Sequence, residues 1–357
     1  MQLIKDVNIG ERKIGDGHPV FIIAEAGVNH NGDMNLAHRL IDQAAAAGAD
    51  AVKFQGFVTE EVMLLDVPKA NYQVVTTGKL DSQYNMVKPL ELSGDQQMEL
   101  KAHCDRTGIL YLCTPYDNTS IDLLDRMGVA AFKVASTDTT NIPFLRYMAG
   151  KGRPVLLSTG MSTLGEVELA IETLRDGGLN EKIILLHCIS EYPAPVNEVN
   201  LRAMQTMRQA FGVPMGFSDH TPGIGASPWA VALGACVIEK HFTLDRTLPG
   251  PDHQSSLVSS ELVELIKTIR LVESALGDGI KRIMPSELPN KPLMQKSLVA
   301  KRTISVGQLI RAEDLTCKRP GTGLSPIWFD RVIGKRASRF IPLDHLIGFM
   351  DIDWTDT

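Results

Sequence analysis

Eight short apolar stretches recur along the chain as far as His241, and each ends in polar, chemically capable side chains. Most are preceded by a helical pattern that closes on glycine, as in AAAAGAD at Gly48. Strands that alternate with helices and carry functional groups at their carboxyl ends are typical of a (β/α)8 barrel. The pattern therefore predicts an α/β fold, a TIM barrel, with its active-site face at these ends. In order, the stretches are FIIAEAG, AVKFQ, LYLCTP, AFKVAS, PVLLSTG, IILLHC, MGFSDH and CVIEKH.

The length of the chain indicates a second, smaller domain after the barrel. A (β/α)8 barrel takes about 250 residues, whereas this chain has 357. We expect the barrel domain to occupy 1–283, with 1–18 forming an N-terminal hairpin because apolar and polar positions alternate there around glycine turns. Residues 284–296 contain three prolines and are expected to form a linker. Residues 297–357 then form a small domain of short strands and turns.

The composition excludes several classes of function. The formal net charge is −6 and no long run of lysine or arginine occurs, so binding to nucleic acid or to an anionic membrane is not expected. No apolar run approaches the roughly 20 residues that span a bilayer, and the N-terminus lacks an apolar signal core. The five cysteines have no CxxC spacing and are expected to be reduced. These features predict a cytoplasmic protein.

Two histidines close the last two predicted strands. His220 ends the seventh strand in FSDHT, and His241 ends the eighth in EKHFT. Neighbouring strands lie about 4.8 Å apart, so the two imidazoles can converge on one divalent ion. Two protein ligands leave positions open for substrate and water, which suits metal-assisted chemistry. The alternative is that each histidine makes its own structural hydrogen bonds.

Two lysines lie within predicted strands. Lys53 and Lys133 have apolar direct neighbours, so both point into the barrel or to its rim. A buried ammonium is costly unless it meets an anion, and two of them with several hydroxyl groups form a cradle for phosphate or carboxylate. The alternatives are ion pairs with Glu25 or Asp138, or a Schiff-base role for Lys133. The hydroxyl groups at the same level belong to Thr114, Ser136, Ser158 and Ser218.

Carboxylates also occur at or just after the strand ends. They are Glu25, Asp138, Glu239 and Asp252. Such groups bind sugar hydroxyls, ligate a metal, or act as acid and base; as structural groups they cap helices or pair with the lysines. Tyr192 follows the sixth strand in SEYPAP, where its hydroxyl is able to bind a ligand or pack against the prolines.

Several motifs in the chain resemble those of the bacterial sialic acid synthase family. This family includes N-acetylneuraminate, legionaminate and pseudaminate synthases and spore-coat polysaccharide relatives. The C-terminal segment, with KRPGTGLSP, resembles the antifreeze-like (SAF) domain of that family. The resemblance covers nearly the whole chain in order. The barrel motifs that carry it are AEAGVNHNG, VKFQ, STGM, LLHCISEYPAP, GFSDHT, IEKHFTLD and LPGPDH.

The resemblance implies an activity, a cofactor and an assembly. The expected reaction condenses phosphoenolpyruvate with an N-acetylmannosamine-type sugar, giving a nine-carbon 2-keto acid and phosphate. The product would be N-acetylneuraminate or N,N'-diacetyllegionaminate. The expected cofactor is a divalent ion, manganese foremost, with magnesium and cobalt as alternatives. The expected assembly is a domain-swapped homodimer.

The family's functional residues carry over onto matching positions. The metal ligands fall on His220 and His241. Arg319, in KRPG, matches an arginine that reaches the partner's active site and touches the acyl group. The phosphoenolpyruvate cradle falls on Lys53, Thr114, Lys133, Ser136, Ser158 and Ser218. The other positions with sugar-side, substrate-binding or acid–base roles are Glu25, Gln55, Ser190, Tyr192, Glu239 and Asp252.

Three positions depart from the family pattern, and two other functions remain open. Ser190 stands where some members have Asn, Asp138 ends ASTD where many have SGE, and Gly56 follows KFQ where a larger residue is common. The rival enzyme is a metal-independent Schiff-base aldolase that uses Lys133 as its nucleophile. The other rival is a non-catalytic carbohydrate-binding protein whose SAF-like segment is the working module.

Overall fold

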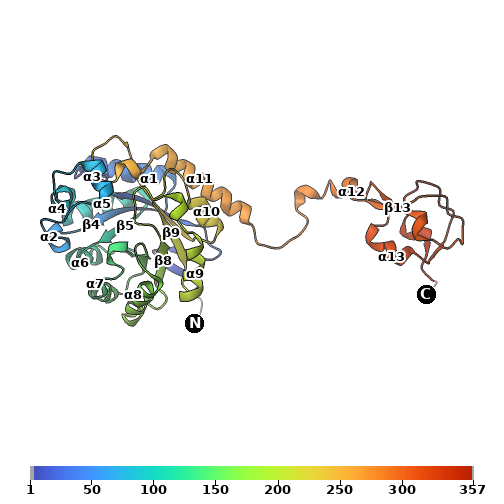
Figure 1. The fold of residues 1–357 in the computed structure, drawn as a ribbon, viewed down its shortest axis with the longest axis horizontal. Helices are drawn as coiled ribbons and strands as arrows, with labels where there is room; N and C mark the ends of the chain where they lie inside the picture. The colour runs from blue at the N-terminus through green and yellow to red at the C-terminus, as the bar shows by residue number, and fades with distance from the viewer. Residues whose placement is uncertain (1–3, 356–357) are drawn as a thin grey trace. The chain divides into compact units, whose positions relative to one another are not determined.

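The computed structural model describes residues 4–355 and separates into two compact units, Met1–Gly277 and Asp278–Thr357 (Figure 1). The division falls a few residues before position 283, where the sequence placed the end of the barrel domain. Each unit has its own hydrophobic core.

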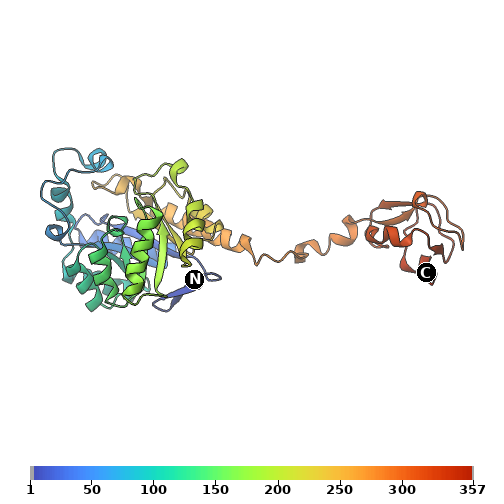
Figure 2. The ribbon, with the colours of Figure 1, turned by 60° about the horizontal axis from the view of Figure 1, so that its bottom comes forward.

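The first unit is a nearly closed barrel of parallel strands, which confirms the fold predicted from the apolar stretches (Figures 1 and 2). Hydrogen-bonded neighbours follow the order β5-β4-β3-β10-β9-β8-β7-β6, so β3 pairs with both the next strand and the last. Each predicted stretch forms one strand. They are β3 (Phe21–Gly27), β4 (Ala51–Gly56), β5 (Leu110–Pro115), β6 (Phe132–Val134), β7 (Val155–Ser158), β8 (Ile183–His187), β9 (Met215–Asp219) and β10 (Val237–Thr243).

Helices follow the strands and cover the outside of the barrel (Figure 2). In the first of them, an apolar stripe from Ala37 to Ala44 is buried in the core. Asp33 caps its start by accepting a hydrogen bond from the backbone N–H of Asn35, and Gly48 ends it in the left-handed region at φ 87°. The helices are α1 (Met34–Ala47), α5 (Gly94–Thr107), α6 (Asn118–Arg126), α7 (Ile142–Ala149), α8 (Leu164–Asp176), α9 (Arg202–Phe211), α10 (Ser227–Ala232) and α11 (Ser259–Leu276), the last preceded by the short strand β11 (Leu257–Val258).

The N-terminal segment covers the amino end of the barrel. β1 (Asp6–Ile9) and β2 (Arg12–Gly15) form an antiparallel hairpin. Ile9 and Ile14 of this hairpin are buried in one cluster with the first residues of the barrel strands, among them Phe21. Polar side chains are therefore available for chemistry at the opposite end of the barrel, where the strands have their carboxyl ends.

The connection between β4 and α5 carries three short helices, α2 (Thr59–Val62), α3 (Asn71–Thr77) and α4 (Gln83–Val87). It leaves the carboxyl end of β4, so it lies on the same face of the barrel as the predicted site residues. Tyr72 in α3 has its ring centroid 5.0 Å from that of Tyr192, in the loop after β8. This connection therefore covers part of the barrel mouth.

The second unit has a small core of its own. The antiparallel pairs β12 (Ser297–Ala300) with β13 (Leu315–Lys318), and β14 (Arg336–Ala337) with β15 (Ile352–Asp353), enclose it together with α13 (Phe329–Val332). The stretch expected to be a linker is exposed and contains α12 (Lys291–Met294), and the first strand begins directly after it. Buried side chains of this core include Leu298, Ile304, Ile310, Val332, Ile341 and Ile347.

Two further observations concern membranes and redox chemistry. Within residues 4–355, every helix is too short or too polar to cross a lipid bilayer. All five cysteines are free thiols, and four of them are buried.

Candidate active site

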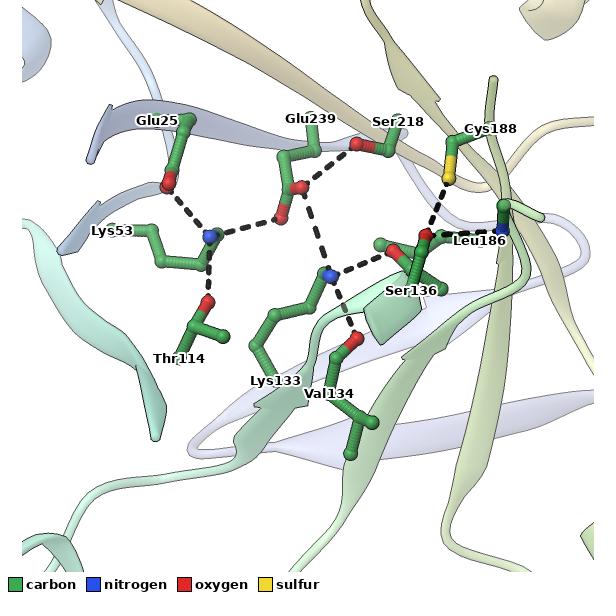
Figure 3. A network of polar contacts seen from close by, with 12 residues as sticks. Glu25, Lys53, Thr114, Lys133, Val134, Ser136, Leu186, Cys188, Ser218 and Glu239 are labelled. Atoms are coloured by element: carbon green, nitrogen blue, oxygen red, sulfur yellow. Dashed lines mark hydrogen bonds and ion pairs between the residues drawn. The ribbon is translucent and has the colours of Figure 1, made fainter. Parts of the chain in front are cut away.

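The carboxyl ends of the barrel strands bring the predicted polar side chains together. Glu25 of β3 is paired in register with Lys53 of β4 on one side and with His241 of β10 on the other. Because side chains two apart on a strand share a face, Glu239 points to the same side as His241. Its neighbour in the ladder is Ser218 of β9. Figure 3 shows the resulting network of polar contacts.

Lys53 lies at the centre of one half of this network. Its Nζ is 2.7 Å from Glu25 Oε2 and 3.7 Å from Glu239 Oε2, and it donates a hydrogen bond of 2.8 Å to Thr114 Oγ1. Burial alone would lower the pKa of Lys53, but the two carboxylates outweigh it and raise the pKa. Lys53 is therefore a buried ammonium whose charge is already compensated by the protein.

Lys133 lies at the centre of the other half. Its Nζ donates to Ser158 Oγ at 2.6 Å and to the carbonyl oxygen of Val134 at 2.9 Å. Its contact with a carboxylate, Glu239 Oε1, is 3.9 Å long. Burial, more than any neighbouring charge, lowers the pKa of Lys133. Its charge is thus less fully compensated than that of Lys53.

Glu239 joins the two halves. Ser218 donates a hydrogen bond of 2.8 Å to its Oε1. Burial alone would raise the pKa of Glu239, but the ammonium groups of Lys133 and Lys53 and this hydrogen bond hold the pKa at about 2. Glu239 is therefore ionised at neutral pH and fixes both lysines.

Glu25 differs from Glu239 although it contacts Lys53 directly. Burial raises the pKa of Glu25 to about 7, against the opposing effect of the Lys53 ammonium. Gln55 Nε2 donates to its Oε1 at 3.3 Å. The pKa of Glu25 is therefore raised where that of Glu239 is lowered, so Glu25 is the more readily protonated carboxyl group of the network.

A second cluster of small polar groups lies beside Lys133. Ser136 Oγ accepts a hydrogen bond of 3.0 Å from the backbone N–H of Gly160 and lies 3.0 Å from Cys188 Sγ. A Cβ atom on Gly160 would lie 2.3 Å from Ser190 Oγ and 2.7 Å from Ser136 Oγ. Only glycine at this position lets these side chains converge.

The two predicted metal ligands lie side by side. The ring centroids of His220 and His241 are 5.7 Å apart. His220 Nδ1 is 2.6 Å from the carbonyl oxygen of Ile189; because a carbonyl only accepts, Nδ1 carries the proton and the lone pair lies on Nε2. Burial lowers the pKa of His220 to about 4, and burial followed by the proximity of His220 lowers the pKa of His241 well below its usual value.

These histidines fit a divalent ion. Both are neutral at physiological pH, which is the form that ligates metal. The backbone hydrogen bond of His220 fixes its tautomer in the manner of a metal-binding histidine. Nδ1 of His241 is buried and, among the described residues, has no hydrogen-bond partner. Across residues 4–355, no cluster of three or more His, Cys, Asp or Glu side chains is arranged to hold a metal.

Two tyrosine rings form an aromatic cluster with the histidines. The ring centroid of Tyr192 lies 4.2 Å from that of His220 and 5.6 Å from that of His241. The ring centroid of Tyr72 lies 5.0 Å from that of Tyr192. The predicted residue Tyr192 is thus at the site, and Tyr72 is an addition that the motifs did not indicate.

Asp252 also reaches this region from the loop after β10. Its Oδ2 is 4.0 Å from His241 Nδ1 and would be 3.6 Å from a Cβ atom on Gly27. Burial raises the pKa of Asp252 to about 6. Ser256 Oγ fixes the loop by donating to the backbone carbonyl of Asp252 at 2.7 Å.

Asp138 and Arg319 differ from the other predicted residues, because their side-chain hydrogen bonds go to residues outside the predicted set. Asp138 accepts hydrogen bonds from Asn141 Nδ2 at 3.0 Å and from Thr137 Oγ1 at 3.2 Å. The salt bridges among the described residues pair Lys53 with Glu25 and not with Asp138. Arg319 belongs to the second unit, where its Nε donates to the carbonyl oxygen of Met294 at 3.0 Å. The roles assigned to Asp138 and Arg319 stay predictions.

Three residues at the site were missed by the sequence-based assignment. Tyr72 lies in the long connection after β4, and the unusual length of that connection was the available signal. Cys188 directly follows the end of β8, but the cysteine spacing marked its thiol only as reduced and gave it no role at the site. Gly160 follows the predicted residue Ser158, and its need for a missing Cβ appears only in three dimensions.

Comparison with known proteins finds matches along most of the chain. The model of the NeuB family matches residues 40–281, and that of the SAF domain matches 295–352. The chain is 48% identical over 327 residues to the N,N'-diacetyllegionaminic acid synthase of Campylobacter jejuni, covering 91% of this chain and 98% of that protein. It is 44% identical over 332 residues to the N,N'-diacetyllegionaminic acid synthase of Legionella pneumophila, covering 92% and 93%. The crystal structure of N-acetylneuraminic acid (sialic acid) synthetase from Leptospira borgpetersenii superposes with a TM-score of 0.72 at 38% identity, covering 81% of this chain and 96% of that one.

Proposed function

Because the chain belongs to the NeuB family, we propose that it is a nonulosonic acid synthase. In the proposed reaction, phosphoenolpyruvate condenses with an N-acetylmannosamine-type sugar to give a nine-carbon 2-keto acid and phosphate. The observation that carries the proposal is the placement of two buried lysines, Lys53 and Lys133, beside two buried histidines, His220 and His241, in one barrel mouth. An anionic three-carbon donor and a polarised carbonyl need these features close together. The test is whether phosphoenolpyruvate, rather than pyruvate, is consumed with release of phosphate.

For the sugar, we propose 2,4-diacetamido-2,4,6-trideoxymannose, with N,N'-diacetyllegionaminate as the product. The support comes from the relatives at 48% and 44% identity, which are both named as synthases of this acid. N-acetylmannosamine, which gives N-acetylneuraminate, is the alternative substrate.

We assign the phosphoenolpyruvate anion to the surroundings of Lys133. The Lys133 ammonium has its carboxylate contact at 3.9 Å, whereas Lys53 has one at 2.7 Å. A bound anion would therefore supply the negative charge that Lys133 lacks at close range. Hydroxyl groups of Ser158 and Ser136 surround it and can donate to phosphate or carboxylate oxygens. Lys53 with Thr114 borders the same space and orients the other end of the anion.

We assign a divalent ion, manganese foremost, to His220 Nε2 and His241. Bound there, it would supply Lewis-acid polarisation of the aldehyde oxygen of the open-chain sugar. The protein's own contribution is to hold both imidazoles neutral and oriented, through the Ile189 carbonyl and the neighbouring ring of Tyr192. Asp252 and Gln55 border this position and are proposed to bind sugar hydroxyl groups.

Two proton transfers precede the loss of phosphate. When C3 of phosphoenolpyruvate attacks the aldehyde carbon, the aldehyde oxygen takes up a proton, and when water adds at C2, the water gives one up. Phosphate then leaves by C–O cleavage and takes up the proton of the C2 hydroxyl group as the ketone forms. We propose Glu25 for one of these transfers because its pKa is raised to about 7. Glu239 stays ionised and orients the lysines. Asp138, whose pKa burial raises, remains the candidate for the other transfer.

A Schiff-base aldolase that acts through Lys133 is the second candidate. The observation that favours it is the lowered pKa of Lys133, since a nucleophilic amine must be neutral. The two enzymes differ in their donor, because an aldolase takes pyruvate and is trapped on Lys133 by borohydride. The third possibility, a non-catalytic carbohydrate-binding protein, gains no support from relatives that are named as synthases.

We further propose that the protein works as a two-fold dimer in which Arg319 completes the sugar site of the other subunit. A guanidinium suits planar acceptors such as the amide carbonyl of an acetamido group. An Arg319→Ala chain mixed with an inactive His220→Ala chain is then expected to regain activity after subunit exchange, because one site of each mixed dimer has both parts intact. Phosphate release measures the recovery. A verified mixed dimer without recovered activity would exclude a shared site.

A further inference from the structure

Asp219 and Lys240 form a buried ion pair directly beside the two histidines. Asp219 precedes His220, Lys240 precedes His241, and the two residues of the pair are partners in the β9–β10 ladder. Asp219 is fully buried, Lys240 is 1% exposed, and Lys240 Nζ lies 3.3 Å from Asp219 Oδ1. Because side chains alternate along a strand, this pair points away from the barrel interior that Glu239 and both histidines face.

The pair fastens the chain on both sides of His220. Asp219 Oδ1 accepts hydrogen bonds from the backbone N–H of Thr221 at 2.8 Å and from its hydroxyl at 2.7 Å. Asp219 Oδ2 accepts from the backbone N–H of Ser227 at 3.1 Å and from its hydroxyl at 2.6 Å. Lys240 Nζ donates to the carbonyl oxygen of Thr221. The residue before His220 is thus one member of the charge pair, and the residue after His220 is hydrogen-bonded to both members.

The same pair holds the backbone of the second histidine. Lys240 is joined to His241 by a peptide bond, so the contacts of Lys240 with Asp219 and Thr221 tie the end of β10 to the end of β9. Replacing a buried ion pair by apolar side chains often leaves protein stability unchanged. The contribution of this pair is therefore expected in the positions of the two imidazoles more than in the stability of the barrel.

We propose that Asp219 and Lys240 are positioning residues that set the separation of His220 and His241 and thereby the affinity of the site for a divalent ion. The inference rests on the proposed function, in which these two histidines hold the ion. A site with two protein ligands has no third one to compensate when either ligand moves. Loss of groups that orient metal ligands lowers metal affinity roughly 10- to 100-fold.

The experiment titrates Mn²⁺ into the chelator-stripped full-length protein and follows free Mn²⁺ by electron paramagnetic resonance. Lys240→Met and Asp219→Asn are each expected to weaken Mn²⁺ binding roughly 10- to 100-fold. Saturating Mn²⁺ is expected to restore most of the turnover, with little change in KM for phosphoenolpyruvate. If a single variant does not fold, the double variant Asp219→Asn/Lys240→Met leaves no unpaired charge and is expected to show the same weakened binding.

Arg270→Met is the matched control. Arg270 Nη2 lies 3.3 Å from Asp50 Oδ2, so it makes an ion pair of the same length near the amino end of the barrel. Its Mn²⁺ affinity is expected to equal that of the wild type. Two outcomes would overturn the inference: unchanged Mn²⁺ affinity in the folded Asp219 and Lys240 variants, or an equal loss of affinity in Arg270→Met. The proposed metal site would stand in either case, provided that Mn²⁺ binding by the wild type depends on His220. Wild-type protein that binds no Mn²⁺ would overturn the proposed metal site as well.

Discussion

Replacing His220 or His241 by alanine is expected to reduce turnover by roughly 10³-fold or more while the barrel stays folded, since a metal that polarises a carbonyl contributes several kcal/mol to the transition state. Both imidazoles are buried and neutral, and each variant leaves a single protein ligand. EDTA is expected to abolish the activity of the wild type, and Mn²⁺ to restore it. Phosphate release with saturating substrates measures the effect.

A surface histidine provides the control for these variants. His103 on α5 pairs with Asp42 outside the barrel, and His103→Ala is expected to keep full, EDTA-sensitive activity. Circular dichroism and thermal unfolding show whether each variant is folded. Full activity in a folded His220→Ala or His241→Ala variant would show that the reaction does not need a metal held by these two histidines.

Replacing Lys133 by methionine is expected to raise KM for phosphoenolpyruvate roughly 10- to 150-fold, because a hydrogen bond to a charged group contributes about 1.5–3 kcal/mol. Methionine preserves the volume, and Glu239 keeps its contact with Lys53. Lys53→Met is also expected to raise KM for phosphoenolpyruvate. In that variant Glu25 loses its cation, so its pKa should rise further and the group should be protonated at neutral pH.

Lys151→Met is the matched control for the lysine variants. Lys151 pairs with Asp122 at 2.6 Å outside the barrel, so its loss is expected to leave KM unchanged. Steady-state kinetics with phosphoenolpyruvate varied at saturating sugar measures all three variants. If KM for phosphoenolpyruvate stays at the wild-type value in both Lys53→Met and Lys133→Met, the anion site is elsewhere.

The location of the site could be predicted from the sequence because it follows from the fold alone. In a parallel barrel every strand presents its carboxyl end on the same face, so polar side chains at those ends must gather there. Residues as far apart along the chain as Lys53 and Glu239 could therefore be assigned to one site before their contacts were known. The alternation of apolar stretches and helical patterns was sufficient for this step.

The partners within the site could not be predicted because they depend on register and loop conformation. Lys53 pairs with Glu25 because the two are register partners in adjacent strands, whereas Asp138 lies in the turn Ser136–Asp138 and binds Asn141 instead. The ring of Tyr72 reaches Tyr192 through the folding of a long connection that no strand pattern describes. The ion pair of Asp219 with Lys240 likewise requires the β9–β10 register.

The most direct test of the central claim supplies the purified Mn²⁺-loaded protein with 2,4-diacetamido-2,4,6-trideoxymannose and either phosphoenolpyruvate or pyruvate. Mass spectrometry identifies the product, and a parallel assay measures phosphate. We predict that phosphoenolpyruvate alone gives a nine-carbon 2-keto acid with one equivalent of phosphate, and that N-acetylmannosamine is the poorer acceptor. Product formation from pyruvate, with borohydride trapping of Lys133, would contradict the account and identify the protein as an aldolase.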